Sequence, residues 1–252
     1  MRLLIPFKMN RNAYVLLLLT GMIFTAFISC KDKKDAPYQI DTSSSKYYPL
    51  AVNKYVVYDV DSLIWVDSTC DTIQTRYQIR YEIVDSFRDE QNRRSYRIET
   101  ATRTDSAGWV PGAVYYVTPA ANGVEYAEKG LQFIKLSYPI EEGRTWEGNA
   151  LIPAHVDADL TYLAGWKYRY ERVAAPYRSE IRGYDTTVTV IQVDQKEGDP
   201  KNTEEYSSRM YGKEIYAYDV GLVFREFIRW SYDPATGCRK GYHMVMREVA
   251  HN

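Results

Sequence analysis

The clearest pattern in the chain is an alternation of apolar or aromatic with polar side chains over residues 73–84. Ile, Thr and Tyr occupy every second position, and mostly Gln, Arg and Glu occupy the positions between them. A period of two is typical of a β-strand with one buried face and one solvated face. A polar segment follows at 88–93, and residues 96–103 then alternate again, which predicts a long β-hairpin.

Similar alternation recurs along the chain and predicts about ten strands in all. Turn-forming residues separate most of these segments, as at 119–123 and 233–237. Strands that follow one another without intervening helices favour hairpin connections. The predicted fold class is therefore mainly β, a curved antiparallel sheet that is open, half-barrel or sandwich-like. The further predicted strands are 113–118, 124–128, 131–137, 166–172, 186–193, 209–217, 222–232 and 242–249.

Little helix is expected, because no long segment keeps a period of 3.6 residues, and the best candidate is the short segment 157–165. The predicted strand 222–232 follows a hairpin turn at 219–221. Alternation along this strand predicts one shared face for a set of large apolar residues. They are Leu222, Phe224, Ile228 and Trp230.

The pattern changes at the N-terminus, where residues 13–28 form an uncharged run of 16 residues. Three basic residues precede the run, and Ser29 and Cys30 follow it. A membrane-spanning helix needs about 20 apolar residues, so this arrangement favours a secretory signal peptide over residues 1–29. The alternative is an uncleaved membrane anchor with an incidental cysteine.

Residues Phe27-Ile28-Ser29-Cys30 resemble a lipobox, the motif of bacterial lipoproteins. The resemblance implies that the leader is cut before Cys30 and that its sulfur carries a diacylglycerol with fatty-acyl chains such as palmitate, enough for stable anchoring. Residues 30–46 are polar and predict a flexible tether. Its charged start resembles the export signal of some surface lipoproteins, with a merely solvated linker as the alternative. The expected location is the cell envelope, on the outer membrane, facing the surface or the periplasm.

The remaining residues, 47–252, are expected to form one antiparallel β domain. Residues 48–56 and 138–146 both begin with Tyr-Pro-aliphatic and continue through a turn residue, Asn53 or Gly143, into a strand. This echo predicts two related halves, with chance similarity as the alternative. The two halves are about 47–137 and 138–252.

The first of these segments, together with residues 216–226, resembles a loosely defined group of Gram-negative outer-membrane and surface lipoproteins of unknown function. Those proteins begin near a Y-x-P-L strand and close near Y-A…V-G-L-V…R-E. This chain has Asn53 where the group usually has Gly. The resemblance implies a curved antiparallel sheet and no particular activity.

Charge excludes some classes of partner. The chain has 32 basic and 33 acidic residues, and three of the basic ones lie in residues 1–29, so the remainder carries a net charge of 29 − 33 = −4. Nucleic acid and anionic lipid both require a basic face, so neither is an expected partner. The 24 tyrosines suit a pleated sheet with one wet face, where the ring packs and the hydroxyl reaches water.

Cysteine usage adds a second structural prediction. With Cys30 assigned to lipid, Cys70 and Cys238 remain. In an oxidising envelope compartment they form a candidate disulfide, which would tie the first strands to the last. Two buried free thiols are the alternative.

No catalytic motif is found, since the chain lacks G-x-S-x-G, H-E-x-x-H, C-x-x-C and a phosphate-binding glycine run. We therefore expect no enzyme, no metal and no cofactor. His243 lies on a predicted strand and is expected to be structural or exposed. The acidic pairs Asp59/Asp61 and Asp157/Asp159 can bind a hard cation or act on a glycosidic bond, but such pairs arise by accident among 33 acids.

The tryptophans are a candidate ligand platform that would stack against sugar rings, with core filling as the alternative. An apolar groove inside the curved sheet, holding lipid or an acyl chain, is a further hypothesis. The sequence thus predicts a lipid-anchored envelope protein that binds a ligand or partner without catalysis. A glycan binder and a carrier of a hydrophobic ligand are the two alternatives. The tryptophans are Trp65, Trp109, Trp146, Trp166 and Trp230.

Overall fold

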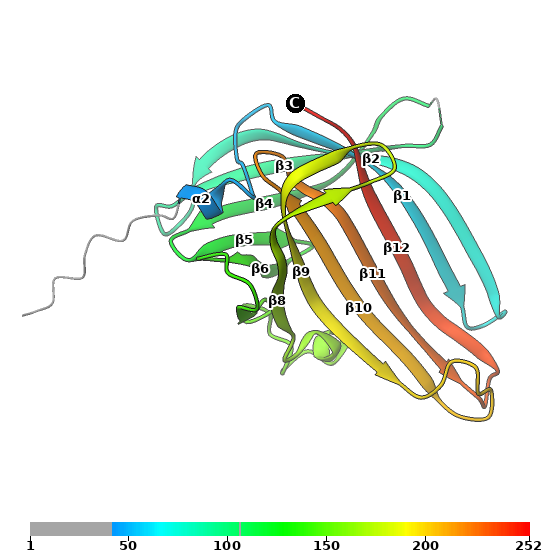
Figure 1. The fold of residues 1–252 in the computed structure, drawn as a ribbon. Helices are drawn as coiled ribbons and strands as arrows, with labels where there is room; N and C mark the ends of the chain where they lie inside the picture. Colours follow the sequence, from blue (N-terminus) through cyan, green and yellow to red (C-terminus); the bar gives the residue numbers. More distant parts are fainter. Residues whose placement is uncertain (1–41, 106) are drawn as a thin grey trace, which may run out of the picture. The chain divides into compact units, whose positions relative to one another are not determined.

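The alternating segments form β-strands of one antiparallel sheet with twelve strands (Figure 1). The structure, a computed structural model, describes residues 42–105 and 107–252. The predicted fold class is confirmed, with twelve strands in place of about ten. The strands are β1 (Tyr55–Val66), β2 (Asp71–Arg88), β3 (Arg94–Arg103), β4 (Val110–Ala120), β5 (Gly123–Glu128), β6 (Leu131–Ser137), β7 (Thr145–Glu147), β8 (Lys167–Arg178), β9 (Gly183–Glu197), β10 (Ser207–Ala217), β11 (Gly221–Asp233) and β12 (Cys238–His251).

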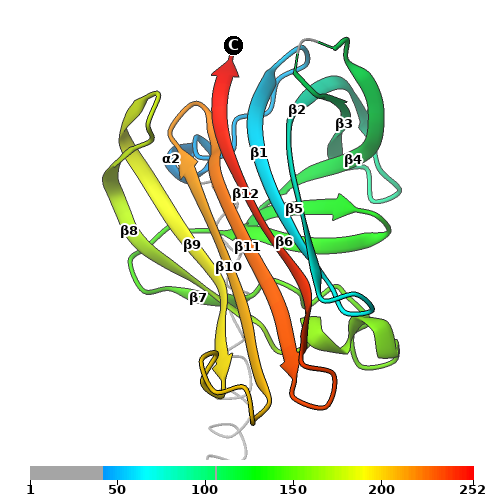
Figure 2. The same cartoon turned by 90° about the vertical axis from the view of Figure 1, so that its right-hand side faces the viewer.

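The first and last strands meet in the middle of the sheet, whose order is β6-β5-β4-β3-β2-β1-β12-β11-β10-β9-β8-β7. Figure 2 shows β1 beside β12. Along this seam Val56 pairs with His251 at one end and Trp65 pairs with Gly241 at the other. All other neighbours are consecutive strands. The sheet therefore consists of two meanders, β1 to β6 and β7 to β12, joined along one seam.

Curvature brings the two edges of the sheet together. The N–H of Ile134 in β6 donates to the carbonyl oxygen of Gly148, just after β7, over 2.7 Å. The carbonyl oxygen of Ile134 accepts a hydrogen bond from Nε1 of Trp146 in β7 at 2.8 Å. A twisted sheet with this many strands has to curl. It nearly closes on itself, so one face is concave and the other convex.

The two strands beyond the ten alternating segments are β1 and β7, and each follows one Tyr-Pro segment. Asn53 and Gly143 both have positive φ angles, 71° and 76°, a conformation that Asn and Gly tolerate best. The N–H of Asn53 donates to the carbonyl oxygen of Ile83 in β2 (2.7 Å), and the N–H of Gly143 donates to that of Tyr170 in β8 (3.0 Å). Each meander thus begins with the same hydrogen-bonded turn against its second strand.

The described helices are short: α2 (Thr42–Ser45) and the 3-10 helix η1 (Ala158–Leu163). The second lies inside the predicted segment 157–165, where the side chain of Asp157 accepts from the N–H of Asp159 and caps the first turn. Neither of these helices has the length and apolar character of a membrane span. The predicted signal peptide, Cys30 and tether residues up to 41 lie outside the described residues.

The main hydrophobic core lies on the concave face, where β-branched residues and tyrosines supply most of the buried side chains. Tyr58, Val60 and Met246 extend it across the seam between β1 and β12. A smaller cluster lies on the opposite face of β10 and β11. Fully buried members of the main core include Val117, Val124, Leu136, Tyr168, Tyr170, Val188, Val190 and Tyr216.

The prediction that Leu222 shares a face with Phe224 is wrong. Tyr216 pairs with Leu222 but its neighbour Ile215 pairs with Phe224, so Val223 is the extra residue of a β-bulge. Leu222 packs against the main core, whereas Val223 and Phe224 belong to the smaller cluster on the other face. One inserted residue places the residues before it on the opposite face from the one that alternation predicts. Alternation alone therefore does not reveal the bulge.

Candidate functional site

A groove of about 500 Å³ lies open on the concave face. One wall comes from β1, β2, β11 and β12, and the other comes from β5, β6, β8 and the segment around η1. Most of its lining is aromatic or aliphatic, as in sites for small apolar molecules, and its volume is within the range of such sites. The apolar lining includes Tyr77, Ile79, Phe133, Trp166, Phe227 and Met244.

An exposed apolar row marks one end of the groove. Ile73 of β2, Ile64 of β1 and Tyr242 of β12 are direct neighbours across the sheet, so their side chains share one face. They are 51%, 42% and 36% exposed, and Tyr242 also lines the groove. Contiguous exposed apolar side chains are typical of binding surfaces. This row is suited to be the entrance for an apolar ligand.

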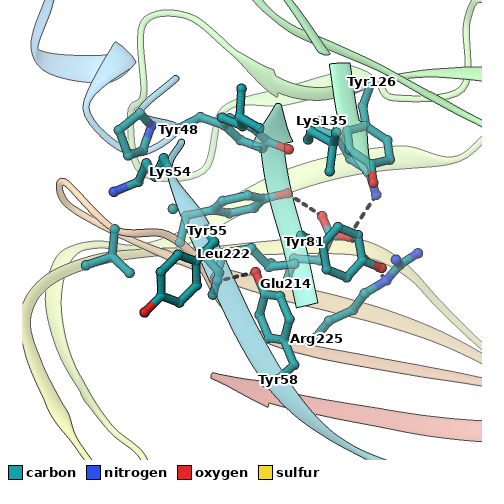
Figure 3. A pocket seen from close by; sticks show the side chains of 17 residues that line it. Tyr48, Lys54, Tyr55, Tyr58, Tyr81, Tyr126, Lys135, Glu214, Leu222 and Arg225 are labelled. Carbon is teal, nitrogen blue, oxygen red and sulfur yellow. Dashed lines mark hydrogen bonds and ion pairs between the residues drawn. The ribbon is translucent and has the colours of Figure 1, made fainter. Parts of the chain in front are cut away.

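A buried ion pair lies at the inner end of the groove. The Nζ atom of Lys135 is 2.8 Å from Oε1 of Glu214, and the two side chains are 6% and 1% exposed. The hydroxyl of Tyr216 donates to Oε2 of Glu214 at 2.6 Å. Figure 3 shows Glu214 between Lys135 and Arg225. Buried charges persist in proteins when they are paired and hydrogen-bonded in this way.

The electrostatics of the pair keep the carboxylate ionised. Burial alone would raise the pKa of Glu214, but Lys135 and Arg225 outweigh burial, and the pKa of Glu214 is lowered. Burial lowers the pKa of Lys135, and Glu214 offsets part of that effect. Lys135 and Arg225 therefore both stabilise the negative charge of Glu214.

Arg225 lies beside this pair on β11, and its side chain is one-fifth exposed. Its Nε atom is 3.4 Å from Oε1 of Glu214, and its Nη1 atom is 4.0 Å from Oε2 of Glu128. Among residues 42–105 and 107–252, the buried Nε–H has no hydrogen-bond acceptor. Burial opposes the charged form, but Glu128 and Glu214 outweigh it and raise the pKa of Arg225. Arg225 is therefore a fixed cation whose contacts with Glu214 and Glu128 are long.

Arg225 and Lys135 also line a second, smaller cavity of about 80 Å³. Tyrosines form much of its wall, and burial raises the pKa of Tyr48, Tyr58 and Tyr81, so all three are neutral phenols. The hydroxyl of Tyr58 donates to the carbonyl oxygen of Leu222 at 2.9 Å. Several tyrosines thus use their hydroxyl groups inside the protein, whereas their abundance predicts hydroxyl groups that reach water.

The five tryptophans do not form one platform. Trp166 is buried in the core, and Trp146 packs on Tyr170 with ring centroids 4.4 Å apart. The guanidinium of Arg103 lies over the ring of Trp109, 4.5 Å from its centroid. Trp146 and Trp166 therefore pack in the main core beside Tyr168, whereas Trp109 lies against Arg103 elsewhere on the sheet.

Trp65 and Trp230 do share a face. Both are in register with Gly241, one from each side, on the convex face of the sheet. Gly241 has a φ of 136°, and a Cβ atom there would lie 2.0 Å from the carbonyl oxygen of Arg229, so a larger residue does not fit. The guanidinium of Arg239 lies 4.7 Å from the ring of Trp230. The surface between the two indoles is thus free of a side chain from β12.

Cys70 and Cys238 are joined in a disulfide with a Cα–Cα distance of 4.9 Å, which is normal for such a bridge. Cys70 ends the turn between β1 and β2, and Cys238 is the first residue of β12. The bridge therefore ties the two strands of the seam together at one end.

The two carboxylates of the acidic pair on β1 bind guanidinium and amide groups. Asp61 binds the guanidinium groups of Arg76 and Arg247, at 2.8 and 2.7 Å, and Asp59 accepts from Gln78. Within the described residues no group of three or more His, Cys, Asp or Glu side chains is placed to hold a metal ion. The acidic side chains of β1 thus serve in surface ion pairs and hydrogen bonds.

His243 lies on the convex face, where its Nε2 atom is 3.0 Å from Oε1 of Glu226. Its ring is partly exposed. This position makes it a member of a surface pair of the kind expected for a structural histidine.

Sequence reasoning missed the charged group at the inner end of the groove. Lys135 lies two residues after Phe133 and four after Leu131, in a strand whose alternation places all three on one face. A lone lysine at an apolar position is the signal that would have pointed to it. Its partner Glu214 lies 79 residues away, a separation that periodicity does not bridge.

Comparison with known proteins adds no family. No protein-family profile and no curated protein matches the chain. Among solved structures, a Bacteroides fragilis protein described as exported, with a YMCC-like fold, aligns with a TM-score of 0.39 and 10% identity over 80% of this chain and 98% of its own. A Parabacteroides distasonis protein described as a lipoprotein aligns with a TM-score of 0.30 and 12% identity over 81% and 98%. TM-scores this low carry no argument about function.

Proposed function

We propose that this protein is a lipid-anchored, non-enzymatic component of the cell envelope that binds a hydrophobic ligand in the concave groove. The observation that carries the proposal is the groove, about 500 Å³ in volume, lined mainly by apolar side chains and entered past exposed Ile64 and Ile73. Removing apolar surface from water gains roughly 25 cal/mol per Å², so a ligand with an alkyl chain gains most from this site.

The anchor in this proposal rests on Cys30 and the lipobox-like residues before it. We place the protein on the outer membrane, facing the surface or the periplasm, with the residues between Cys30 and α2 as the tether. The tether is thus shorter than the expected 30–46, because Ser44 is buried and its hydroxyl accepts a hydrogen bond from the N–H of Ile140. In cells, Cys30→Ala should leave the protein in the soluble fraction or as an unprocessed precursor. Globomycin should make the precursor of the wild type accumulate. If the mass of the mature protein isolated from its native cells shows no acyl chains, the proposed anchor is wrong.

Ligand binding is tested with the chain from Lys31 onward, because it contains the whole compact unit Gln39–Asn252 and its core. The protein is first shown to unfold cooperatively, then incubated with a membrane-lipid extract and, separately, with soluble glycans. Mass spectrometry identifies what remains bound after gel filtration. We expect retention of lipid, and a wild-type protein that retains none contradicts the proposed function.

Two matched variants locate the binding face. Met244→Glu places a carboxylate in the apolar wall of the groove and should abolish lipid retention, because the charge would lose its hydration there. Leu63→Glu makes the same kind of change on the convex face, where Leu63 pairs with His243, and should leave retention unchanged. Equal loss in both variants, with both folded, argues against the groove.

A glycan binder remains the second candidate, and the observation that favours it is the pair of tryptophans beside Gly241. Indole rings on one exposed face can stack on sugar rings. The double variant Trp65→Ala/Trp230→Ala should abolish retention of a soluble glycan if this surface binds it. Retention of glycan by the double variant, or no retention by the wild type, removes this candidate.

A further inference from the structure

The charges within the groove constrain the head group of its ligand. Four charged side chains line the groove among its apolar walls: Lys129, Lys135 and Arg225 are cationic, and Glu128 is the one acid. Glu214, behind the lining, pairs with Lys135. A positive excess therefore remains even when this buried pair is counted, in a chain that is negatively charged outside its first 29 residues. An anionic head group complements the groove better than a cationic one.

Arg225 is the cation best placed to receive that head group. Lys135 is nearly fully buried and already bound to Glu214 at 2.8 Å. Lys129 is an exposed side chain in the turn between β5 and β6. Arg225 is one-fifth exposed, and its acidic neighbours Glu214 and Glu128 lie 3.4 and 4.0 Å away, beyond the length of a charge-assisted hydrogen bond. A guanidinium with free donors binds a planar carboxylate through two parallel hydrogen bonds.

The direction of β11 sets the length of the ligand. Arg225 and Arg229 point to the same face of β11, and Arg229 pairs with Tyr242 at the entrance row. Four residues of strand separate them, which is roughly 13 Å. Between them Phe227 lines the groove. A ligand held at Arg225 therefore needs a long apolar chain to reach Ile64 and Ile73.

We infer that the groove binds a long-chain fatty acid, with its carboxylate on Arg225 and its alkyl chain along β11 towards the entrance. This inference rests on the proposed function, because it names the ligand class for the same groove. The alkyl chain covers the apolar walls, and the carboxylate pairs with the exposed part of the Arg225 guanidinium. A neutral head group would leave the positive excess of the groove without an added anion.

The experiment compares ligands with different head groups and chain lengths. Palmitate, hexadecanol and octanoate are titrated into the chain from Lys31 onward, and binding is followed by the fluorescence of the tryptophans, of which Trp166 lines the groove. We expect palmitate to bind at least about tenfold more tightly than hexadecanol, because a charge-assisted pair is lost with the alcohol. Octanoate should bind more weakly than palmitate, since its chain does not span the groove.

Arginine variants identify the residue that binds the carboxylate. Arg225→Gln should weaken palmitate binding to the level of hexadecanol and leave hexadecanol binding unchanged. Arg209→Gln is the matched control on the convex face, where Arg209 lies over Tyr211, and should bind both ligands as the wild type does. If Arg225→Gln does not fold, Arg225→Lys keeps the charge but not the two-donor geometry, and should lie between wild type and hexadecanol level.

Different results overturn different claims. Equal affinity of palmitate and hexadecanol for the wild type, or a palmitate preference that Arg225→Gln retains, overturns the fatty-acid inference while the hydrophobic groove stands. If neither ligand binds, the proposed function fails together with the inference. Glu128→Gln adds a test of opposite sign: removing the like charge should tighten palmitate binding, and weaker binding contradicts the placement of the carboxylate at Arg225.

Discussion

The two faces of the sheet differ in how far their ion-paired side chains are exposed to water. On the concave face, Lys135 and Glu214 are withdrawn from water and contact each other. On the convex face, acidic and basic side chains meet in exposed pairs, such as Asp61 with Arg76, whose side chain is 79% exposed. The same strands carry both faces, since successive residues point in opposite directions. A charged side chain on the concave face therefore loses hydration and depends on a direct partner, whereas a charged side chain on the convex face stays hydrated.

The two faces also differ in the space beside their aromatic rings. Cationic side chains lie over rings on both faces, as Arg209 does over Tyr211 on the convex face and Lys135 over Phe133 in the groove. Other rings of the groove pack on one another, as Trp166 does on Phe227 with centroids 6.1 Å apart. On the concave face these rings border a groove of about 500 Å³ with a mainly apolar lining, so this is the face suited to an apolar ligand.

The largest expected effect concerns the seam, which both faces share. The double variant Cys70→Ser/Cys238→Ser should lower the free energy of unfolding by about 4 to 5 kcal/mol in the chain-entropy model, because the bridge closes a sequence separation of 168 residues. Urea unfolding of the wild type and the variant measures this difference. Two thiols that alkylate in the native protein without reductant would show that the bridge is absent.

The next effect is confined to the concave face. Lys135→Met removes the nearest cationic partner of the buried Glu214, which then keeps Arg225 at 3.4 Å as its cation. The variant should lower the free energy of unfolding by about 3 to 5 kcal/mol, because a buried ion pair is broken from one side. The control, Lys135→Met/Glu214→Leu, removes both charges and should recover most of the loss. A single variant as stable as the wild type would contradict the contrast between the faces.

The same carboxylate predicts a pH dependence. The pKa of Glu214 is lowered from 4.5 in the folded protein, so its ion pair contributes stability above that value and loses it as the pH falls through the lower folded pKa. The stability difference between wild type and Glu214→Gln should therefore shrink between pH 7 and pH 3. Urea titrations at both values measure it, and a difference that grows on acidification contradicts the lowered pKa.

Sequence alone predicted the fold class well because alternation is a local property. Ten strands were recognised by their period of two, and β6 was found with the bounds that the structure shows. The two others gave weaker signals: β7 has three residues, and β1 ends in the unbroken apolar run Leu63–Val66. The two similar Tyr-Pro segments nevertheless predicted a strand after Asn53 and another after Gly143.

The groove was harder to predict because it depends on pairing between distant residues. Nothing near Lys135 in the sequence indicates Glu214, and nothing near Val56 indicates that β1 pairs with β12. The bulge at Val223 also reversed the expected face of Leu222. Local pattern thus fixed which residues form strands, whereas long-range register decided which charges and rings meet.

The smallest expected effect lies on the convex face and completes the comparison. Asp61→Asn removes a carboxylate that binds Arg76 and Arg247, both on the surface. Water and salt screen such pairs, so the free energy of unfolding should fall by only about 0.2 to 1 kcal/mol, and 1 M salt should reduce the difference further. The loss in Lys135→Met should persist in the same salt, because that pair is shielded from solvent. If Asp61→Asn cost as much as Lys135→Met, or if salt reduced both losses equally, burial would not be the property that separates the two faces.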